Sequence, residues 1–466
     1  MPIRPFAIRH SPIRYSLIVF ALALGAALGL LPLKLGGLIV GGSALLILSL
    51  HTPKSGLYLL IPAIPFSSLL QLNVAGVNIG PTEALFALIM ASWLLQMMAR
   101  REIFIPHPPM LWPFLLFLGA IALSWLTTFS LNASLIETLK WVEMLAIYLF
   151  ITANFVRQES RWLVVVLLLS GLAQAGLGLY QFIFKVGPEG FLLFGGQFLR
   201  AYGTFQQPNP YAGYLGLILP LALAIFLWAV EKMARVSSQS SPPSKRIFTA
   251  ETQRHREKIK KNSVSLRLSG ENFLAAAQQD KWYNALFWLI LSGVALGAGV
   301  AALFASQSRG GWLGFAGGAL IVILLKGGKW TAIAATGLIA GAILISMGAL
   351  ALLPASILER FIDILPFITL PDISAIPLTD ANFATIERLA HWQSARAMWR
   401  DHLWLGVGFG NYEAIYAAYS LGRWIEPLYV QGMYLHLSII FALITLIEKQ
   451  GNYTNVKRLY RFEQNK

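Results

Sequence analysis

The chain has 466 residues, of which 56% are hydrophobic and 12% charged, and it carries a net charge of +15. Soluble globular proteins contain roughly 25% charged residues, so this composition excludes a soluble enzyme. The absence of cysteine excludes disulfides and thiol chemistry. Apolar runs of about twenty residues recur along the chain, and they predict an all-α protein that crosses a membrane many times.

The apolar runs predict about twelve transmembrane helices. The first two runs follow each other so closely that they indicate a helical hairpin and not a cleavable signal peptide. The predicted spans lie near residues 15–31, 35–50, 57–72, 82–98, 110–128, 141–156, 162–184, 211–230, 283–305, 311–325, 330–353 and 433–447.

The positions of lysine and arginine predict the orientation of the chain. Arg4, Arg9 and Arg14 precede the first span and place the N-terminus in the cytoplasm. With that topology, 26 of the 36 Lys and Arg residues lie in cytoplasmic segments and ten lie outside. The positive charge therefore orients the protein in its membrane, and no nucleic acid partner is needed to explain it.

One polar stretch interrupts the apolar pattern. Residues 231–282 are rich in Ser, Lys and Arg and poor in large apolar side chains, which predicts a disordered basic cytoplasmic insertion. A polybasic lipid-binding patch is the second reading of this stretch. The insertion follows the N-terminal transmembrane part, 1–230, with its outer loop at 185–210. It precedes the spans of 283–353, a large outer loop at 354–432, and a last short span with a cytoplasmic tail at 433–466.

The large outer loop contains a segment with helical periodicity. Apolar and cationic side chains recur at three- and four-residue steps over residues 386–399, which predicts a helix with a mixed face. This helix should end before the glycines at positions 406, 408 and 410. One interpretation is an amphipathic helix on the membrane surface. The other is a helix that contributes side chains to an outward-facing site.

Two arginines lie where an outer loop meets a predicted span. Arg200 opens an irregular stretch with Gly203, Pro208 and Pro210, and irregular backbone at membrane depth requires protein or water around it. Arg309 lies between two almost wholly apolar spans, where an ionisable group is a functional candidate. Each arginine alone is also typical of an interfacial anchor. Together they offer planar forks that bind pyrophosphate oxygens in pairs.

Three motifs resemble the O-antigen ligase and O-antigen polymerase superfamily. The resemblance covers roughly residues 162–424, apart from the insertion. The motifs are Arg200-Ala-Tyr-Gly-Thr-Phe-Gln-Gln-Pro-Asn-Pro-Tyr-Ala, Ser308-Arg-Gly-Gly-Trp-Leu-Gly-Phe315, and Glu387-Arg-Leu-Ala-His-Trp-Gln followed by Leu405-Gly-Val-Gly-Phe-Gly-Asn-Tyr412. They are specific for the superfamily and do not separate its branches.

The resemblance implies an enzyme of the bacterial inner membrane that needs no metal and no cofactor. It would transfer a glycan from an undecaprenyl-pyrophosphate carrier to a lipid or glycan acceptor on the periplasmic face, as in the assembly of cell-envelope polysaccharides. By the match of motif positions, the expected substrate-binding residues are Arg200, Arg309 and Arg388, with Tyr202 and Asn209 beside the first of them. Membrane lipid and the lipid-linked glycan are the implied partners.

The resemblance also implies a histidine base late in the large loop, usually in a His-Ala-His-Asn type segment. This chain departs from that pattern, because the corresponding stretch contains a single histidine, His436, inside an apolar run. His391, one helical turn after Arg388, is the other candidate base. Histidine suits the task because it titrates near neutral pH. We expect an altered or truncated C-terminal end, because this would explain why the His-Ala-His-Asn type segment is missing.

Two further functions stay open at this stage. One is a transporter of the inorganic-carbon (bicarbonate) type, because the second motif resembles such proteins too. A transporter would place ionisable groups near mid-membrane, whereas Glu83, Glu137 and Glu143 all lie close to predicted span boundaries, where a solvated carboxylate is expected. The other is a non-catalytic, truncated member of the same family.

Overall fold

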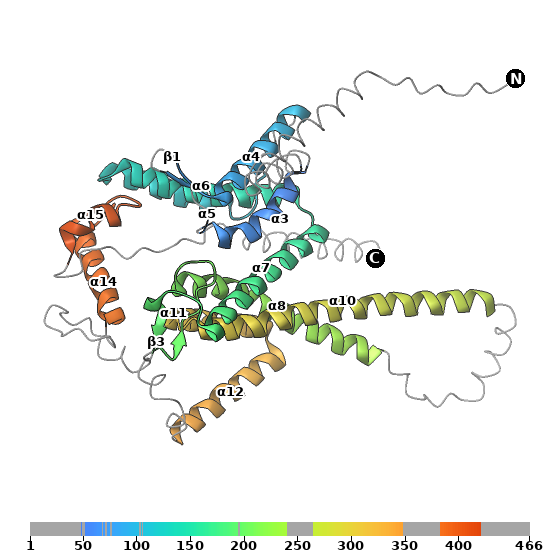
Figure 1. Cartoon of the computed structure of the whole chain (residues 1–466). Coiled ribbons are helices and arrows are strands. Elements are labelled where there is room, and N and C mark those ends of the chain that lie inside the picture. The colour runs from blue at the N-terminus through green and yellow to red at the C-terminus, as the bar shows by residue number, and fades with distance from the viewer. Residues whose placement is uncertain are drawn as a thin grey trace, which may run out of the picture. The chain divides into compact units, whose positions relative to one another are not determined.

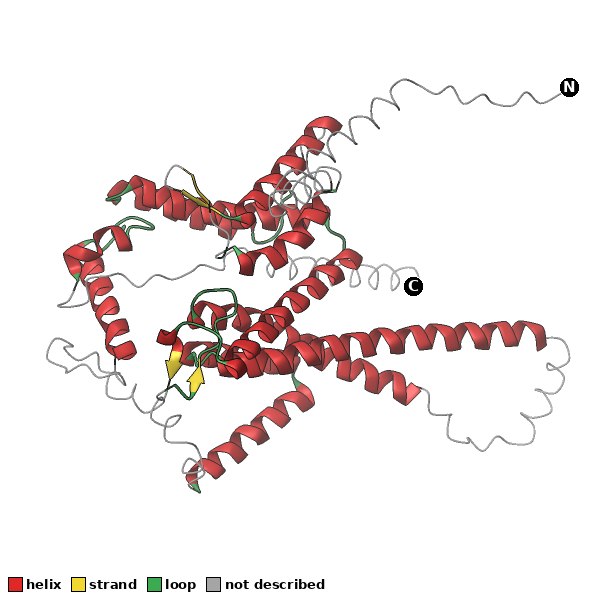
Figure 2. Ribbon diagram, in the orientation of Figure 1, coloured by secondary structure: helices red, strands yellow, loops and turns green. Residues whose placement is uncertain are grey.

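The computed structural model describes residues 52–67, 72–74, 77–101, 106–193, 196–239, 264–347 and 383–420, together with Leu48, Leu69 and Phe104. These residues form mainly helices, with two small antiparallel hairpins (Figures 1 and 2). The chain divides into two compact units. The first unit holds residues 1–60 and Thr82–Phe104, and the second holds Ile61–Pro81 and everything from Ile105 onward.

Among the described residues, five helices are long and apolar enough to cross a membrane. They overlap five of the predicted spans. They are α4 (Pro81–Arg100), α7 (Arg157–Phe184), α8 (Pro208–Gln239), α10 (Val264–Ala305) and α11 (Arg309–Lys326). Two shorter apolar helices also match predicted spans, namely α5 (Leu111–Ser124), extended by η2 (Trp125–Thr127), and α12 (Gly328–Ser346). The predicted spans 15–31, 35–50 and 433–447 lie outside the described residues, apart from Leu48.

The span predicted at residues 57–72 is wrong as a single helix. Instead α3 (Pro53–Ala63) gives way to the 3-10 turn η1 (Ile64–Phe66), and the hairpin of β1 (Leu72–Val74) and β2 (Val77–Ile79) follows. In the hairpin Leu72 lies opposite Ile79. Pro62 and Pro65 explain the early end of the helix, because each lacks a backbone donor and crowds the preceding turn.

The core of the second unit is a bundle of α7, α8, α10 and α11. α10 packs on α7 and α8, and α11 packs on α8. Lys232 donates to Asn284 (3.0 Å), and the amide of Ala201 donates to the carbonyl of Ala305 (3.0 Å). The start of α8 therefore lies near the end of α10, so the two helices run antiparallel, side by side in Figure 1. Large buried side chains fill the space between the helices, among them Leu168, Tyr211, Tyr214, Leu215, Leu219 and Leu303.

Several helices are longer than their apolar runs. Both α8 and α10 extend into the segment for which the sequence predicts disorder, since α8 continues to Gln239 and α10 begins at Val264. That segment includes Ala, Leu, Gln and Arg, which are strong helix formers. Likewise α6 (Leu131–Asn154) begins well before the predicted span at 141–156. The side chain of Ser130 caps it by accepting from the amide of Ala133 (3.4 Å).

The predicted helix of the large outer loop is present. It is α14 (Phe383–Asp401), which packs on the short helix α15 (Tyr412–Tyr419). Three glycines separate the two helices, with φ of +66° at Gly406, +89° at Gly408 and +79° at Gly410. α14 thus ends before these glycines, as the sequence predicts, because their left-handed backbone cannot continue a right-handed helix.

Candidate functional site

The first two motifs meet at one end of the helix bundle. Arg200 donates from Nε to the carbonyl of Ser306 (3.1 Å) and from Nη2 to Oδ1 of Asn209 (3.2 Å). The hydroxyl of Ser308 donates to the same Asn209 oxygen (3.0 Å). These bonds join the loop before α8, the first turn of α8, and the turn between α10 and α11. Arg200 and Asn209 of the first motif and Ser308 of the second, predicted from separate parts of the sequence, therefore lie together.

Arg309 begins α11 at this same end. Its neighbour Ser308 is the N-cap residue, but the Ser308 side chain bonds Asn209 and makes no capping bond to its own helix. The first turn of a helix carries the positive end of the backbone dipole, which attracts anions. The first turn of α11, which begins at Arg309, and the guanidinium group of Arg200 thus place positive charge at this end of the bundle.

Two glutamines of α7 hold the irregular backbone that follows Arg200. Gln181 accepts from the amides of Tyr202 (3.2 Å) and Gly203 (2.8 Å) and donates to the carbonyl of Gly203 (2.8 Å). Gln174, two turns earlier on the same helix face, accepts from the amide of Thr204 (3.2 Å). Side chains of the protein therefore form hydrogen bonds with the backbone polar groups of this irregular segment. Such bonds are needed where irregular backbone lies within a membrane.

Gly203 is the residue that the local geometry requires. Its φ is +56°, and a Cβ there would lie 2.6 Å from the ring of Tyr211 and 2.7 Å from Oε1 of Gln174. Its neighbour Tyr202 is half-buried, with its ring 5.2 Å from that of Phe191. Only glycine combines this backbone conformation with such close packing, so the glycine of the first motif shapes the loop that carries Arg200.

The third motif docks on another part of the second unit. Asn411 is fully buried, and its Oδ1 accepts from the amide of Ser130 (2.6 Å). Its Nδ2 donates to the hydroxyls of Thr128 (2.7 Å) and Ser134 (2.7 Å). The amide of Phe409 donates to the hydroxyl of Ser124 (3.1 Å). We call these residues the Asn411 cluster; it fixes the loop after α14 to the corner between α5 and α6.

Two of the motif's glycines allow the loop to approach this corner. A Cβ on Gly408 would lie 2.6 Å from Cα of Thr128, and a Cβ on Gly410 would lie 2.8 Å from the carbonyl oxygen of Ala133. The sequence predicts only that these glycines end the helix. It does not predict that they also allow the loop to pack closely against the α5–α6 corner. The available signal was the run of hydroxyl residues at the α5–α6 corner, Ser124, Thr127, Thr128, Ser130 and Ser134.

Arg388 and His391 lie on α14, with Arg388 exposed and His391 only 6% exposed. Nδ1 of His391 lies 3.2 Å from the hydroxyl of Tyr412, and that hydroxyl donates to the carbonyl of His391 (3.1 Å). The two contacts fit a tautomer with the proton on Nδ1 and the lone pair on Nε2. Arg388 and His391 share a helix face, because residues three apart are neighbours on a helix.

Burial controls the protonation of this group. Desolvation lowers the pKa of His391, against a smaller opposite effect from Glu387. Burial raises the pKa of Tyr412 to about 12, and the nearby Tyr416 adds to the shift. Tyr416 is itself buried, with its ring 4.9 Å from that of His391. The imidazole is therefore neutral and the phenol protonated at neutral pH.

The other candidate residues divide into those that the structure describes and those that it does not. His436 lies outside the described residues. Within the described ranges, no three His, Asp or Glu side chains gather as a metal site requires. Glu137 pairs with Lys140 (2.6 Å), whereas Glu143 is only 8% exposed. The expectation of a solvated carboxylate at Glu143 is wrong, because α6 begins earlier than predicted and places this residue in mid-helix.

The comparisons with known proteins identify a domain in the second half of the chain. The model of the family described as O-antigen ligase matches residues 293–447. This match begins within α10 and includes the second and third motifs, while the first motif, from Arg200, lies before it. Searches of curated proteins and of solved structures gave no match.

The family match and the apolar helices agree on the class of protein. An O-antigen ligase domain supports a glycan-transferring role of ligase or polymerase type, and five helices in the described part of the chain fit a membrane in length and composition. The resemblance predicted from the three motifs is thus confirmed for the part of the chain that the family model covers. Residues 293–447 of this membrane protein thus match the O-antigen ligase family model.

Proposed function

We propose that the protein transfers a glycan from an undecaprenyl-pyrophosphate carrier to a lipid or glycan acceptor on the periplasmic face of the inner membrane. One observation carries the proposal: Asn209 accepts hydrogen bonds from both Arg200 (3.2 Å) and Ser308 (3.0 Å). This link brings the first two motifs, with their arginines, to one end of a transmembrane bundle. The O-antigen ligase domain supports the class of reaction.

The donor pyrophosphate binds Arg200 and Arg309 in this proposal. The acceptors that hold Arg200 at Ser306 and Asn209 are a carbonyl and a carboxamide oxygen, which are neutral. They fix the plane of the guanidinium without cancelling its charge. A guanidinium fork matches two phosphate oxygens at once, and the first turn of α11 adds to the attraction. Tyr202 lies two residues after Arg200 on the same loop.

The chemical step needs a base for the acceptor and stabilisation for the leaving group. The acceptor hydroxyl gives its proton to a histidine while its oxygen bonds the anomeric carbon of the donor sugar. The bond from that carbon to the pyrophosphate breaks, and the electron pair leaves with the lipid pyrophosphate. Arg200 and Arg309 stabilise the departing negative charge. His391 is the base that the described residues offer, with Arg388 one turn before it, and His436 is the second candidate.

Asn209 gives the sharpest test of the donor site. Asn209→Asp keeps the shape of the side chain but places a carboxylate on Arg200, which cancels the charge that the pyrophosphate needs. We expect this change to reduce glycan transfer about 10- to 100-fold, because the new carboxylate competes with the pyrophosphate for Arg200, and a hydrogen bond to a charged group contributes about 1.5–3 kcal/mol. Transfer is measured in membrane vesicles with a lipid-linked glycan donor and an acceptor, at equal amounts of folded protein.

Substitutions of the arginines complete the experiment. Arg200→Ala and Arg309→Ala should reduce transfer as strongly, and Arg200→Lys should restore little, because lysine lacks the planar fork. Lys185→Ala is the matched control, since Lys185 lies on the same outer loop and its Nζ donates to the carbonyl of Gly196 (3.2 Å). Normal transfer by Asn209→Asp and by both alanine variants would refute the pyrophosphate site. Uptake of labelled bicarbonate by the same vesicles would favour a transporter instead.

A further inference from the structure

A second polar cluster lies at the opposite end of α8 and α11. The two helices run parallel, because Asn209 meets Ser308 at their first turns and Glu231 meets Lys326 near their last turns. α11 has 18 residues, which at 1.5 Å per residue gives a length of about 27 Å, close to the thickness of the hydrocarbon core. The two ends of this bundle therefore reach opposite faces of a membrane.

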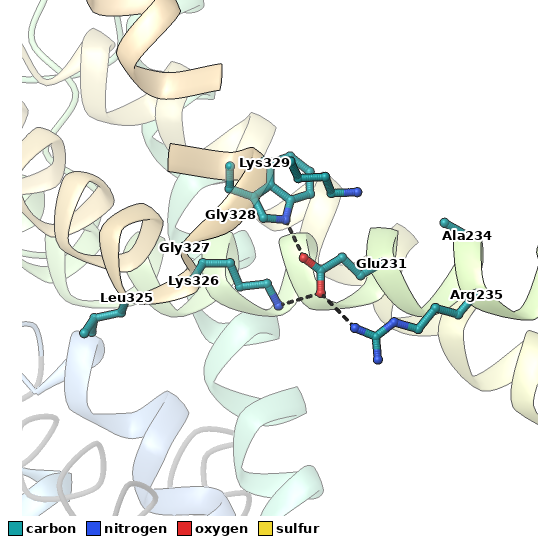
Figure 3. A pocket seen from close by; sticks show the side chains of 9 residues that line it. Glu231, Ala234, Arg235, Leu325, Lys326, Gly327, Gly328 and Lys329 are labelled. Atoms are coloured by element: carbon teal, nitrogen blue, oxygen red, sulfur yellow. Dashed lines mark hydrogen bonds and ion pairs between the residues drawn. The ribbon is translucent and has the colours of Figure 1, made fainter. Parts of the chain in front are cut away.

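The cluster is organised around the carboxylate of Glu231. It accepts from Nε1 of Trp330 (2.6 Å) and from Nζ of Lys326 (3.0 Å), and Arg235 lies 3.8 Å away (Figure 3). Nζ of Lys329 lies 5.0 Å from the centre of the Trp330 ring. These side chains come from the end of α8, the end of α11 and the start of α12, so three elements contribute to one group.

These residues line a shallow cavity of about 610 Å³ that is open to solvent, which we call the Glu231 cavity. Gly327 and Gly328 form the turn between α11 and α12 with φ of +68° and +56°, and this turn brings Lys326 and Lys329 to the same cavity. The space is large enough for the headgroup of a phospholipid. Its remaining lining residues are Ala234 and Leu325.

The cavity carries an excess of positive charge. The residues that line the cavity include three cations, Arg235, Lys326 and Lys329, and one carboxylate, Glu231, so the lining has a formal charge of +2. The Arg235 pair is weak, because its atoms are 3.8 Å apart and the arginine side chain is 79% exposed. Glu231 therefore positions Lys326 and Trp330 without neutralising the group. Tryptophan and lysine side chains of this kind lie at headgroup depth in membranes.

We propose that the Glu231 cavity binds the phosphate headgroup of an anionic phospholipid, on the membrane face opposite to Arg200 and Arg309. Basic cavities between transmembrane helices are suited to anionic headgroups on the cytoplasmic side, where such lipids lower the surface potential. A convergent cavity on three elements distinguishes this site from single cations that merely orient the chain. The proposal does not depend on the glycan-transfer activity.

The test measures lipid binding to the purified full chain in detergent. Native mass spectrometry follows the retention of phosphatidylglycerol, with phosphatidylcholine and inorganic phosphate as separate probes. We expect phosphatidylglycerol to bind in preference to both. Lys329→Ala and Arg235→Ala should each weaken its binding about fivefold, which corresponds to one surface cation. Arg161→Ala is the matched control, because Arg161 also lies beside a tryptophan (5.3 Å from the Trp162 ring) but outside the cavity.

A change at Glu231 separates lipid binding from a purely structural ion pair. Glu231→Gln keeps an oxygen for Trp330 and raises the formal charge of the group to +3, so we expect tighter binding of phosphatidylglycerol. Equal binding of phosphatidylglycerol and phosphatidylcholine, or an equal loss in Arg161→Ala, would overturn the proposal. Displacement of the lipid by inorganic phosphate at the same concentration would overturn the assignment to a lipid and indicate a free-anion site. Weaker binding in Glu231→Gln would also contradict it.

Discussion

The Asn411 cluster allows a prediction that is independent of any activity. Asn411→Ala removes the acceptor of the Ser130 amide (2.6 Å) and the donor to two hydroxyls (both 2.7 Å), at a site with no solvent exposure. A buried polar group that loses its partner costs about 1–3 kcal/mol, and Asn411→Ala removes three such hydrogen bonds at once. We therefore expect the loop 405–411 to undock more easily by about 3 kcal/mol.

Hydrogen–deuterium exchange measures this undocking directly. Two backbone amides report on it, because the amide of Ser130 binds Asn411 and the amide of Phe409 binds the hydroxyl of Ser124 (3.1 Å). A loss of about 3 kcal/mol should accelerate exchange at both amides on the order of 100-fold. Asn284→Ala is the matched control, since Asn284 is an exposed asparagine that bonds Lys232 (3.0 Å), and it should leave both amides unchanged. Wild-type exchange at both amides in Asn411→Ala would refute the reasoning.

Three further predictions follow from the geometry. Gly410→Ala should undock the same loop, because φ is +79° and the new Cβ would lie 2.8 Å from the Ala133 carbonyl; the exchange experiment checks it. Gly203→Ala should destabilise the bundle by roughly 2–4 kcal/mol in thermal unfolding, whereas Gly216→Ala, whose Cβ would meet open space, should be neutral. Burial lowers the pKa of His391 below its ordinary 6.5, so the folded state resists protonation. The stability should therefore be full above pH 6.5 and fall below it, where the unfolded chain binds the proton; His391→Gln should flatten this dependence in melting curves at pH 5.5 and 7.5.

The sequence predicted the spanning helices better than their ends. Apolar length alone identifies α7 or α11, because a run of about twenty such residues has few other stable arrangements in a protein of this composition. The ends of the helices depend on single residues such as prolines and capping serines. A hydropathy average over about twenty residues does not resolve them. The prolines at 62 and 65 cut α3 short, and the capping by Ser130 starts α6 early. That early start placed Glu143 inside the helix, where the sequence had predicted a solvated boundary.

The candidate site was predictable in its residue types and not in its contacts. Arginines in outer loops were recognisable, because charge is conspicuous in an apolar chain. The bridge from Arg200 through Asn209 to Ser308 joins residues about a hundred positions apart, and no periodicity encodes such a distance. The Asn411 cluster is the stronger case: Asn411 and Ser130 are 281 positions apart, so the motif that contains Asn411 gave no sign of its partner. The placement of Arg388 relative to Arg200 and Arg309 stays a prediction.

The motif residues thus fall into two groups, those that shape the backbone and those that we propose to bind the substrate. Gly203, Gly408 and Gly410 allow close approach of other atoms where a Cβ would collide. Asn411 accepts from the Ser130 amide and donates to two hydroxyls at the α5–α6 corner. None of these four needs to touch a substrate. Arg200 and Arg309 differ from them in the proposed function, in which their charge binds the anionic pyrophosphate. A loss of transfer in a glycine or Asn411 variant should therefore appear together with faster amide exchange. A loss in Asn209→Asp should appear with exchange unchanged, and this difference separates a damaged loop from a neutralised binding site.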